Sequence, residues 1–168
     1  KARALEADGA SVHDLATGAV SGADIVITML ADGPAVDDVL RAQGVLAAMR
    51  AGATLIDMSS IDPPTARLHE NAALECGLRY LDAPVSGGTA GATAGTLAIM
   101  AGGKTATFQD VTSFFVPMGR ATHVGPAGSG QLAKLRNQTI VAITIGAVSE
   151  ALYLAERGGA DPAAVRMA

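Results

Sequence analysis

Three polar side chains in the last quarter of the chain have the spacing of a reactive cluster. Lys134, Asn137 and Gln138 stand at positions i, i+3 and i+4 of a helical pattern, so their side chains share one helix face. An amine beside two amides suits proton exchange with a substrate hydroxyl or carbonyl group. The same spacing also suits a lysine that extends to solvent while the amides cap nearby backbone. Spacing alone leaves both interpretations open.

A segment of small residues begins at Ser86, Gly87 and Gly88 and runs to Gly95. It follows the short predicted strand 80–82, and open α/β sheets bind ligands at this end of their strands. Free backbone amides and a hydroxyl group suit a carboxylate, and glycine lets a ligand approach the backbone closely. A flexible surface turn would have the same composition. In either case we expect a loop here.

Two further segments lie at equivalent strand ends. Leu30 is the last residue of the apolar run 24–30 and Ala31 comes directly after it. Ser60 follows the apolar run 53–58. Each segment suits either a ligand contact or an ordinary loop. The histidines, in contrast, are scattered along the chain without the spacing of metal ligands, so no metal site is expected.

The segments that must position these residues alternate between strands and helices. Short apolar runs predict buried strands, and apolar residues at helical spacing predict helices between them. Pro63 and Pro64 mark the first turn of one helix. This alternation predicts a parallel, doubly wound α/β sheet. The expected strands are 24–30, 53–58, 80–82, 96–100 and 121–124, and the expected helices include 63–75, 106–115 and one around 36–40.

A long helix is expected after the sheet, from Gln131 to about Arg157. Asp161 followed by Pro162 is typical of an N-cap and the first helical position, which predicts another helix. The apolar stretch 137–149 is shorter than the roughly 20 residues that cross a bilayer, so we expect it to be buried in protein. The chain begins inside what looks like an amphipathic helix and ends inside another helical pattern, so the natural protein is expected to be longer at both ends.

Composition narrows the classes of partner. A net charge of −4 and 3% aromatic residues provide neither a basic face nor a stacking platform, so nucleic acid is not an expected partner. A small-molecule substrate fits better, and no membrane partner is expected. Cys76 is the single cysteine, which excludes an intrachain disulfide and favours a cytoplasmic protein. We expect its thiol to pack as a small apolar group.

Two motifs in the chain resemble signatures of the β-hydroxyacid dehydrogenase family. The segment 82–88 (Asp-Ala-Pro-Val-Ser-Gly-Gly) resembles its substrate-binding signature, and Gly128-Ser129-Gly130-Gln131 with the following Lys134 resembles its catalytic-lysine signature. The resemblance implies an oxidoreductase that transfers a hydride between NAD or NADP and a small β-hydroxyacid or semialdehyde. Lys134 would act as general acid in reduction and as general base in oxidation.

The resemblance also implies binding roles and a substrate preference. Asn137 and Gln138 would hold substrate together with the segment 86–88. Gln138 stands where many members have asparagine, and an Asn-Gln pair is usual in tartronate semialdehyde reductases. A 3-hydroxyisobutyrate dehydrogenase, or a non-catalytic binding module with a dehydrogenase-like fold, is the alternative. The cofactor contacts implied at strand ends fall on Leu30, Ala31 and Ser60.

The family's architecture implies a domain division. Residues 1–127 would form part of a Rossmann-type dinucleotide-binding domain that lacks its first βα unit. Residues 128–168 would form the interdomain helix and the start of an all-α C-terminal domain, through which relatives form homo-oligomers. No Gly-x-Gly-x-x-Gly phosphate loop occurs in its expected context, so we expect the chain alone to bind cofactor poorly and to be inactive.

Overall fold

Three short strands form a parallel half-sheet in the computed structural model, which describes residues 2–168. Their register places Thr28, Asp57 and Asp82 opposite one another at the carboxyl ends of the strands. The three strand predictions are confirmed, with bounds shorter or longer by one or two residues. The strands are β1 (Ile25–Thr28), β2 (Thr54–Asp57) and β3 (Arg79–Asp82).

The second half of the sheet runs partly in the opposite direction. β5 (Leu97–Gly103) pairs antiparallel with β3 and with the short β4 (Val85–Ser86), whereas β6 (Gly119–Gly125) pairs parallel with β5. The expectation of a fully parallel sheet is therefore wrong at β5, although the Rossmann-type α/β arrangement is confirmed. A parallel β5 would need a crossover packed on the sheet face. The connection instead contains β4 and α5 (Gly88–Ala94), a helix of small residues that buries only Gly91.

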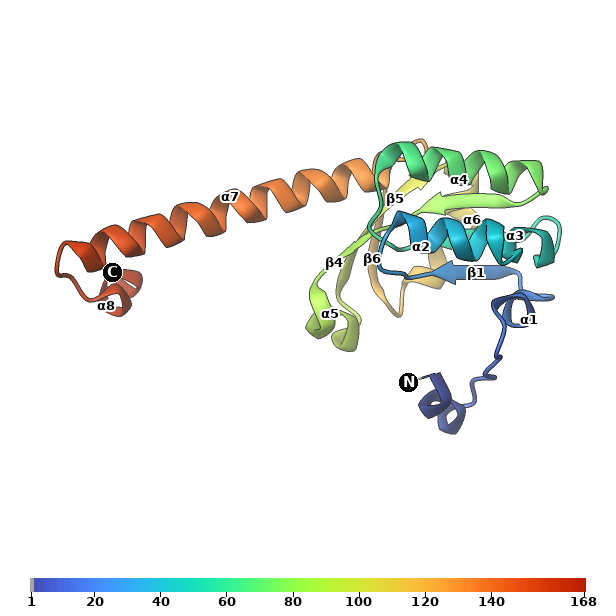
Figure 1. The fold of residues 1–168 in the computed structure, drawn as a ribbon, viewed down its shortest axis with the longest axis horizontal. Helices are drawn as coiled ribbons and strands as arrows, with labels where there is room; N and C mark the ends of the chain where they lie inside the picture. The colour runs from blue at the N-terminus through green and yellow to red at the C-terminus, as the bar shows by residue number, and fades with distance from the viewer. Residues whose placement is uncertain (1) are drawn as a thin grey trace. The chain divides into compact units, whose positions relative to one another are not determined.

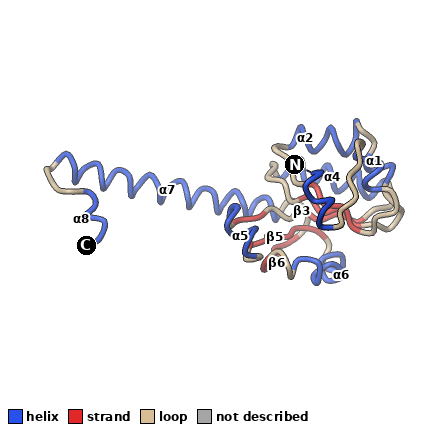
Figure 2. The backbone as a smooth tube through the Cα atoms, turned by 90° about the horizontal axis from the view of Figure 1, so that it is seen from below, coloured by secondary structure: helices blue, strands red, loops and turns tan. Residues whose placement is uncertain are grey.

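Helices cover both faces of the sheet, and alternate strand residues face the two layers. Leu55 packs in a cluster with the helices that precede and follow β2, whereas the next residue, Ile56, packs in a second cluster with α6 (Thr105–Phe115). Figure 2 shows α2 and α4 on one side of the strands and α6 on the other. The helices of the first layer are α1 (Ala16–Val20), α2 (Gly33–Asp37), the π-helical turn η2 (Asp38–Ala42), α3 (Val45–Ala48) and α4 (Pro63–Glu75).

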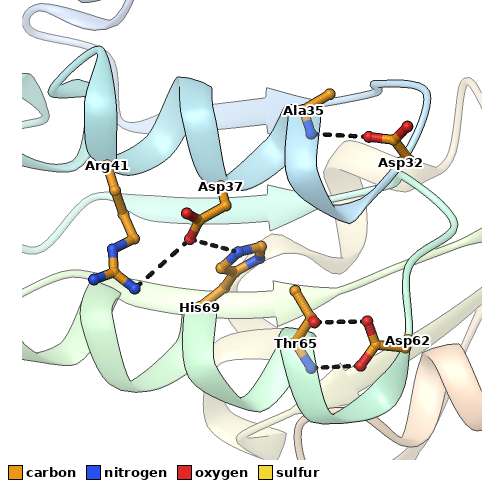
Figure 3. A network of polar contacts seen from close by, with 7 residues as sticks. All are labelled: Asp32, Ala35, Asp37, Arg41, Asp62, Thr65 and His69. Atoms are coloured by element: carbon orange, nitrogen blue, oxygen red, sulfur yellow. Dashed lines mark hydrogen bonds and ion pairs between the residues drawn. The ribbon is translucent and has the colours of Figure 1, made fainter.

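Polar contacts join the helices of the first layer. Asp37 lies 3.6 Å from both Arg41 and the buried His69, which reaches it from α4. Side chains cap the starts of α2 and α4. Asp32 accepts from the Ala35 amide across 2.9 Å, and Asp62 accepts from the Thr65 amide across 2.9 Å. Figure 3 shows these contacts, of which the one between Asp37 and His69 joins α2 to α4. The predicted helix 63–75 is confirmed at both bounds.

Asp62 is the N-cap of α4, and its replacement by alanine tests this local start signal. Its carboxylate accepts from the Thr65 hydroxyl across 2.6 Å and from the Thr65 amide across 2.9 Å. These two bonds, the hydroxyl first, lower the pKa of Asp62 below its usual 3.8. Asp62→Ala is expected to lower the free energy of unfolding by about 1 kcal/mol at neutral pH.

The pH dependence of that loss has a defined sign. A lowered folded-state pKa means that the carboxylate stabilises the fold above pH 3.8 and that this contribution is lost as the pH falls through the folded value. The difference between wild type and Asp62→Ala should therefore shrink on acidification, measured by urea unfolding. The exposed Asp14, replaced by alanine, is the control. A gap that widens at acidic pH would contradict the capping role.

The C-terminal part of the chain is helical, as predicted. α7 (Ser129–Arg157) is one continuous helix, and α8 (Pro162–Met167) begins with the Asp161 carboxylate accepting from the Ala163 amide. The chain divides into two compact units, Lys1–Lys134 and Leu135–Ala168. The first turns of α7 thus belong to the sheet unit (Figure 1).

Several expectations about burial are wrong. The stretch 137–149 is exposed, apart from the half-buried Asn137, because no part of the second unit covers its apolar residues. With its flanks it lies in a 29-residue helix that is long and apolar enough to cross a membrane by length and composition alone, a test that helices of soluble proteins also pass. The N-terminal helix η1 (Ala2–Asp8) is a 3₁₀ helix that buries no residue, so the amphipathic pattern is not used. Cys76 is exposed rather than packed.

Candidate active site at the carboxyl ends of the strands

The start of α7 is bonded to the end of β3 through one buried carboxylate. Asp82 is fully buried, and its two oxygens accept from the backbone amides of Gly128, across 2.8 Å, and Gln131, across 2.9 Å. Burial raises the pKa of Asp82, against the opposing effect of these amide bonds. The carboxylate satisfies amides at a helix N-terminus that have no partner within the helix. The beginning of α7 is thereby fixed to the sheet.

Two glycines let the helix approach this closely. A Cβ on Gly130 would overlap the Met100 carbonyl oxygen and lie 2.6 Å from that of Asp82. A Cβ on Gly102, in β5, would lie 2.8 Å from the Gly130 amide nitrogen. Both glycines are needed because backbone meets backbone at this point. Gly130 belongs to the lysine motif, so that motif is also a packing motif.

Lys134 lies against the strand that leads into the small-residue segment. Its half-buried side chain donates a hydrogen bond from Nζ to the Val85 carbonyl oxygen across 2.8 Å. Val85 is followed directly by Ser86. The two segments that the sequence singled out separately, Lys134 and 86–88, therefore meet in the sheet unit.

The small-residue segment is more ordered than expected. Ser86 is half-buried at the end of β4, Gly87 precedes α5, and Gly88 is the first residue of that helix, so the expected loop is wrong beyond Gly87. Gly87 has φ +136° and its Cβ would lie 3.1 Å from Leu97 Cδ2, which only glycine tolerates well. The segment is a strand end joined by a glycine turn to a short helix, with both glycines exposed.

The residues expected to contact cofactor lie at the neighbouring strand ends. The half-buried Leu30 donates its backbone amide to the Ser59 hydroxyl across 2.9 Å, whereas Ala31 and Ser60 are exposed. Since Thr28, Asp57 and Asp82 are in register, the segments that follow them emerge from the same edge of the sheet. One edge thus presents Ala31, Ser60 and the Lys134 segment.

Comparison with protein families identifies this arrangement. Residues 1–125 match the family model for the NAD binding domain of 6-phosphogluconate dehydrogenase. Residues 128–168 match that for the NAD-binding domain of NADP-dependent 3-hydroxyisobutyrate dehydrogenase. The chain belongs to the β-hydroxyacid dehydrogenase family. The predicted resemblance is confirmed.

Individual relatives of this dehydrogenase family are similar along nearly the whole chain. The 2-hydroxy-3-oxopropionate reductase of Escherichia coli is 45% identical over 162 residues, which are 95% of this chain and 56% of that protein. An NAD-dependent L-serine dehydrogenase of Pseudomonas aeruginosa is 43% identical over 94% of this chain and 53% of its own length. The structure of Mycobacterium tuberculosis 3-hydroxyisobutyrate dehydrogenase with L-serine matches with a TM-score of 0.89 and 41% identity over 95% of this chain and 55% of that one. The chain spans about half the length of these relatives.

The remaining candidate residues of this family member lie on α7 in the second unit. Asn137 is half-buried and Gln138 is exposed. Among residues 2–168, no group of three or more histidine, cysteine or acidic side chains is arranged to hold a metal ion.

Sequence reasoning missed the residues that hold the lysine helix in place. Asp82 and Gln131 both stood inside the two quoted motifs, but no role was assigned to either. The available signal was a carboxylate at the end of an apolar strand, because a buried charge requires partners. Ser59 was likewise passed over in favour of Ser60, although Ser59 is the buried residue of the pair.

Proposed function

We propose that the protein containing this chain is an NAD(P)-dependent reductase of tartronate semialdehyde, also called 2-hydroxy-3-oxopropionate. The observation that carries the proposal is the 2.8 Å hydrogen bond from Lys134 Nζ to the Val85 carbonyl, beside the segment that suits a carboxylate. The 45% identity to the Escherichia coli reductase and the Asn137-Gln138 pair support this substrate over other β-hydroxyacids.

Lys134 would act as the proton donor. A protonated lysine has three N–H donors, and the Val85 carbonyl uses one of them, which orients the amine and leaves the others for substrate. In the direction of reduction, a proton moves from Nζ to the carbonyl oxygen as a hydride reaches the carbonyl carbon, and an alcohol forms. In the direction of oxidation, the neutral amine takes the hydroxyl proton.

Two sets of residues are proposed to bind substrate. The amides and hydroxyl of Ser86, Gly87 and Gly88 would bind its carboxylate, and Asn137 and Gln138 would contact its remaining oxygens. The cofactor, NAD or NADP, supplies or accepts the hydride when it is bound. Ala31 and Ser60 fit its nicotinamide half because both are exposed at the carboxyl edge, whereas the Leu30 amide already has a partner in Ser59.

The proposal extends to the setting of the protein. We propose a division into a dinucleotide-binding part, residues 1–127, and the start of a helical domain, residues 128–168. We also propose a cytoplasmic homo-oligomer without membrane or nucleic-acid partners.

Substrate comparison tests the proposed activity. The full-length protein is assayed with tartronate semialdehyde, 3-hydroxyisobutyrate and L-serine, each with the appropriate form of NAD and of NADP. We expect the highest kcat/KM for reduction of tartronate semialdehyde. A higher kcat/KM for 3-hydroxyisobutyrate would assign the protein to that activity instead. Absence of turnover with all three would favour a non-catalytic binding module.

A further inference from the structure

Gln131 has an unusual environment for an amide in the first turn of a helix. Its side chain is 1% exposed, although first-turn residues commonly face solvent. Both ends are used, because Nε2 donates to the Ser59 carbonyl across 2.8 Å and Oε1 accepts from the Ile61 amide across 3.1 Å. Its own backbone amide donates to Asp82. One residue thus ties α7 to the ends of both β2 and β3.

The bonds continue from Ser59 to the end of β1. The Ser59 hydroxyl accepts from the Leu30 amide across 2.9 Å, and the Ser59 amide donates to Asp57 Oδ1 across 3.0 Å. The same Asp57 oxygen accepts from the Thr28 hydroxyl across 2.8 Å. Thr28, Asp57 and Ser59 are all buried, so water does not replace these bonds. A buried chain of hydrogen bonds therefore links the segments following β1 and β2 to Gln131.

Lys134 follows Gln131 by three residues, about one helical turn. The chain of bonds fixes the helix at Gln131 against the strand ends next to Ala31 and Ser60. The Lys134 bond to Val85 fixes the next turn against the segment 86–88. The position of the amine relative to those two strand ends is therefore set through Gln131.

We propose that Gln131 is a positioning residue of the reaction, which sets Lys134 relative to the segments that contact the cofactor. This inference rests on the proposed function, because it needs Lys134 to be the proton donor. A misplacement of about 1 Å can lower a reaction rate by roughly 10²-fold. Gln131 would act through Lys134 and contact neither substrate nor cofactor.

The test uses two variants of the full-length protein. Gln131→Met keeps the length of the side chain and removes both hydrogen bonds. We expect kcat to fall about 10- to 100-fold, with KM for substrate and cofactor changed by less than about 3-fold, because the binding segments remain while the amine moves. The control is Gln43→Met, at an exposed glutamine in the same unit, for which wild-type kinetics are expected.

Gln131→Glu adds a readout that a purely structural role would not change. When protonated, the introduced carboxyl can donate to the Ser59 carbonyl and accept from the Ile61 amide, as the native amide does. When ionised, it cannot donate. Burial and the nearby carboxylates of Asp57 and Asp82 should raise its pKa, whereas two cations oppose this effect: Lys134, one turn further along α7, and Arg67 of α4, which approaches Gly128 at the start of the helix. The ratio of variant to wild-type kcat should therefore rise as the pH falls, whereas the ratio for Gln131→Met should stay flat.

The outcomes separate this inference from the proposed function. Normal turnover by Lys134→Ala overturns both. An inactive Lys134→Ala with wild-type kcat for a folded Gln131→Met overturns only the positioning role. If circular dichroism shows that Gln131→Met is unfolded, Gln131→Glu decides, and a pH-independent kcat ratio for that variant overturns the inference.

Discussion

Replacement of Lys134 by alanine is expected to lower kcat of the full-length protein by about 10²- to 10⁴-fold, the usual contribution of a positioned acid or base. KM should change much less, because the segment 86–88 and the strand ends remain in place. The measurement is steady-state reduction of tartronate semialdehyde with the preferred nicotinamide cofactor. Lys134→Arg should not restore turnover, since a guanidinium keeps its proton.

A matched lysine separates loss of the reacting amine from loss of charge. Lys104 is exposed at the start of α6 and follows β5, which runs from the carboxyl end of β3 toward its amino end, so Lys104→Ala should keep wild-type kinetics. The hydrogen bond of Lys134 to Val85 is partly exposed, so Lys134→Ala should also remain folded, which far-ultraviolet circular dichroism checks. A folded Lys134→Ala protein with turnover within about 3-fold of wild type would remove the lysine from the mechanism.

Gly130→Ala is expected to have the largest effect on stability. The new methyl group would meet the backbone carbonyls of Met100 and Asp82, which cannot rotate away as side chains can. Either α7 lifts from the sheet, losing the Asp82 bonds, or the strands shift. We expect the free energy of unfolding to fall by about 3 kcal/mol, the upper part of the range for overpacking. Urea unfolding followed by circular dichroism measures the change.

Gly146 supplies the matched control on the same helix. A Cβ at Gly146 has no neighbour within 4 Å in the chain. Gly146→Ala should therefore stabilise the 168-residue chain slightly, by about 0.5–1 kcal/mol, because alanine is the better helix former. Opposite signs for the two substitutions would locate the close approach at the first turn of α7. Equal effects would mean that Gly130 is not pressed against the sheet.

The sequence predicted the helices and strands that have local signals, such as proline at a helix start or a short apolar run. Pro63 and Pro64 predicted the start of α4, whose cap Asp62 was not predicted, and the apolar runs predicted the strands. The segment 88–94 was expected to be a loop because its glycine, alanine and threonine residues show no apolar periodicity. It forms a helix whose Gly91 packs against Leu97, a contact from outside the segment. The direction of β5 likewise depends on pairing rather than on its own residues.

In the candidate site, too, some residues could be predicted from the sequence and others could not. Motif resemblance singled out Lys134 and Ser86, and the structure brings their segments together through Val85. The bonds of Asp82 and Gln131 join residues 46 to 72 positions apart in the chain, so no local pattern could predict them. Which amide a buried carboxylate accepts from is a property of the folded sheet.

The division of α7 between the two units has a consequence for protein engineering. The residues that anchor the helix, Gly128 to Lys134, fold with the sheet, although the helical family match begins at residue 128. A chimera that takes its C-terminal half from a relative should therefore be joined after Lys134. A junction there retains the bonds of Asp82 and Gln131 and exchanges everything from Leu135 onward, including Asn137 and Gln138. A junction at 128 would place a foreign helix start against a native sheet, where the fit tolerates no added atom.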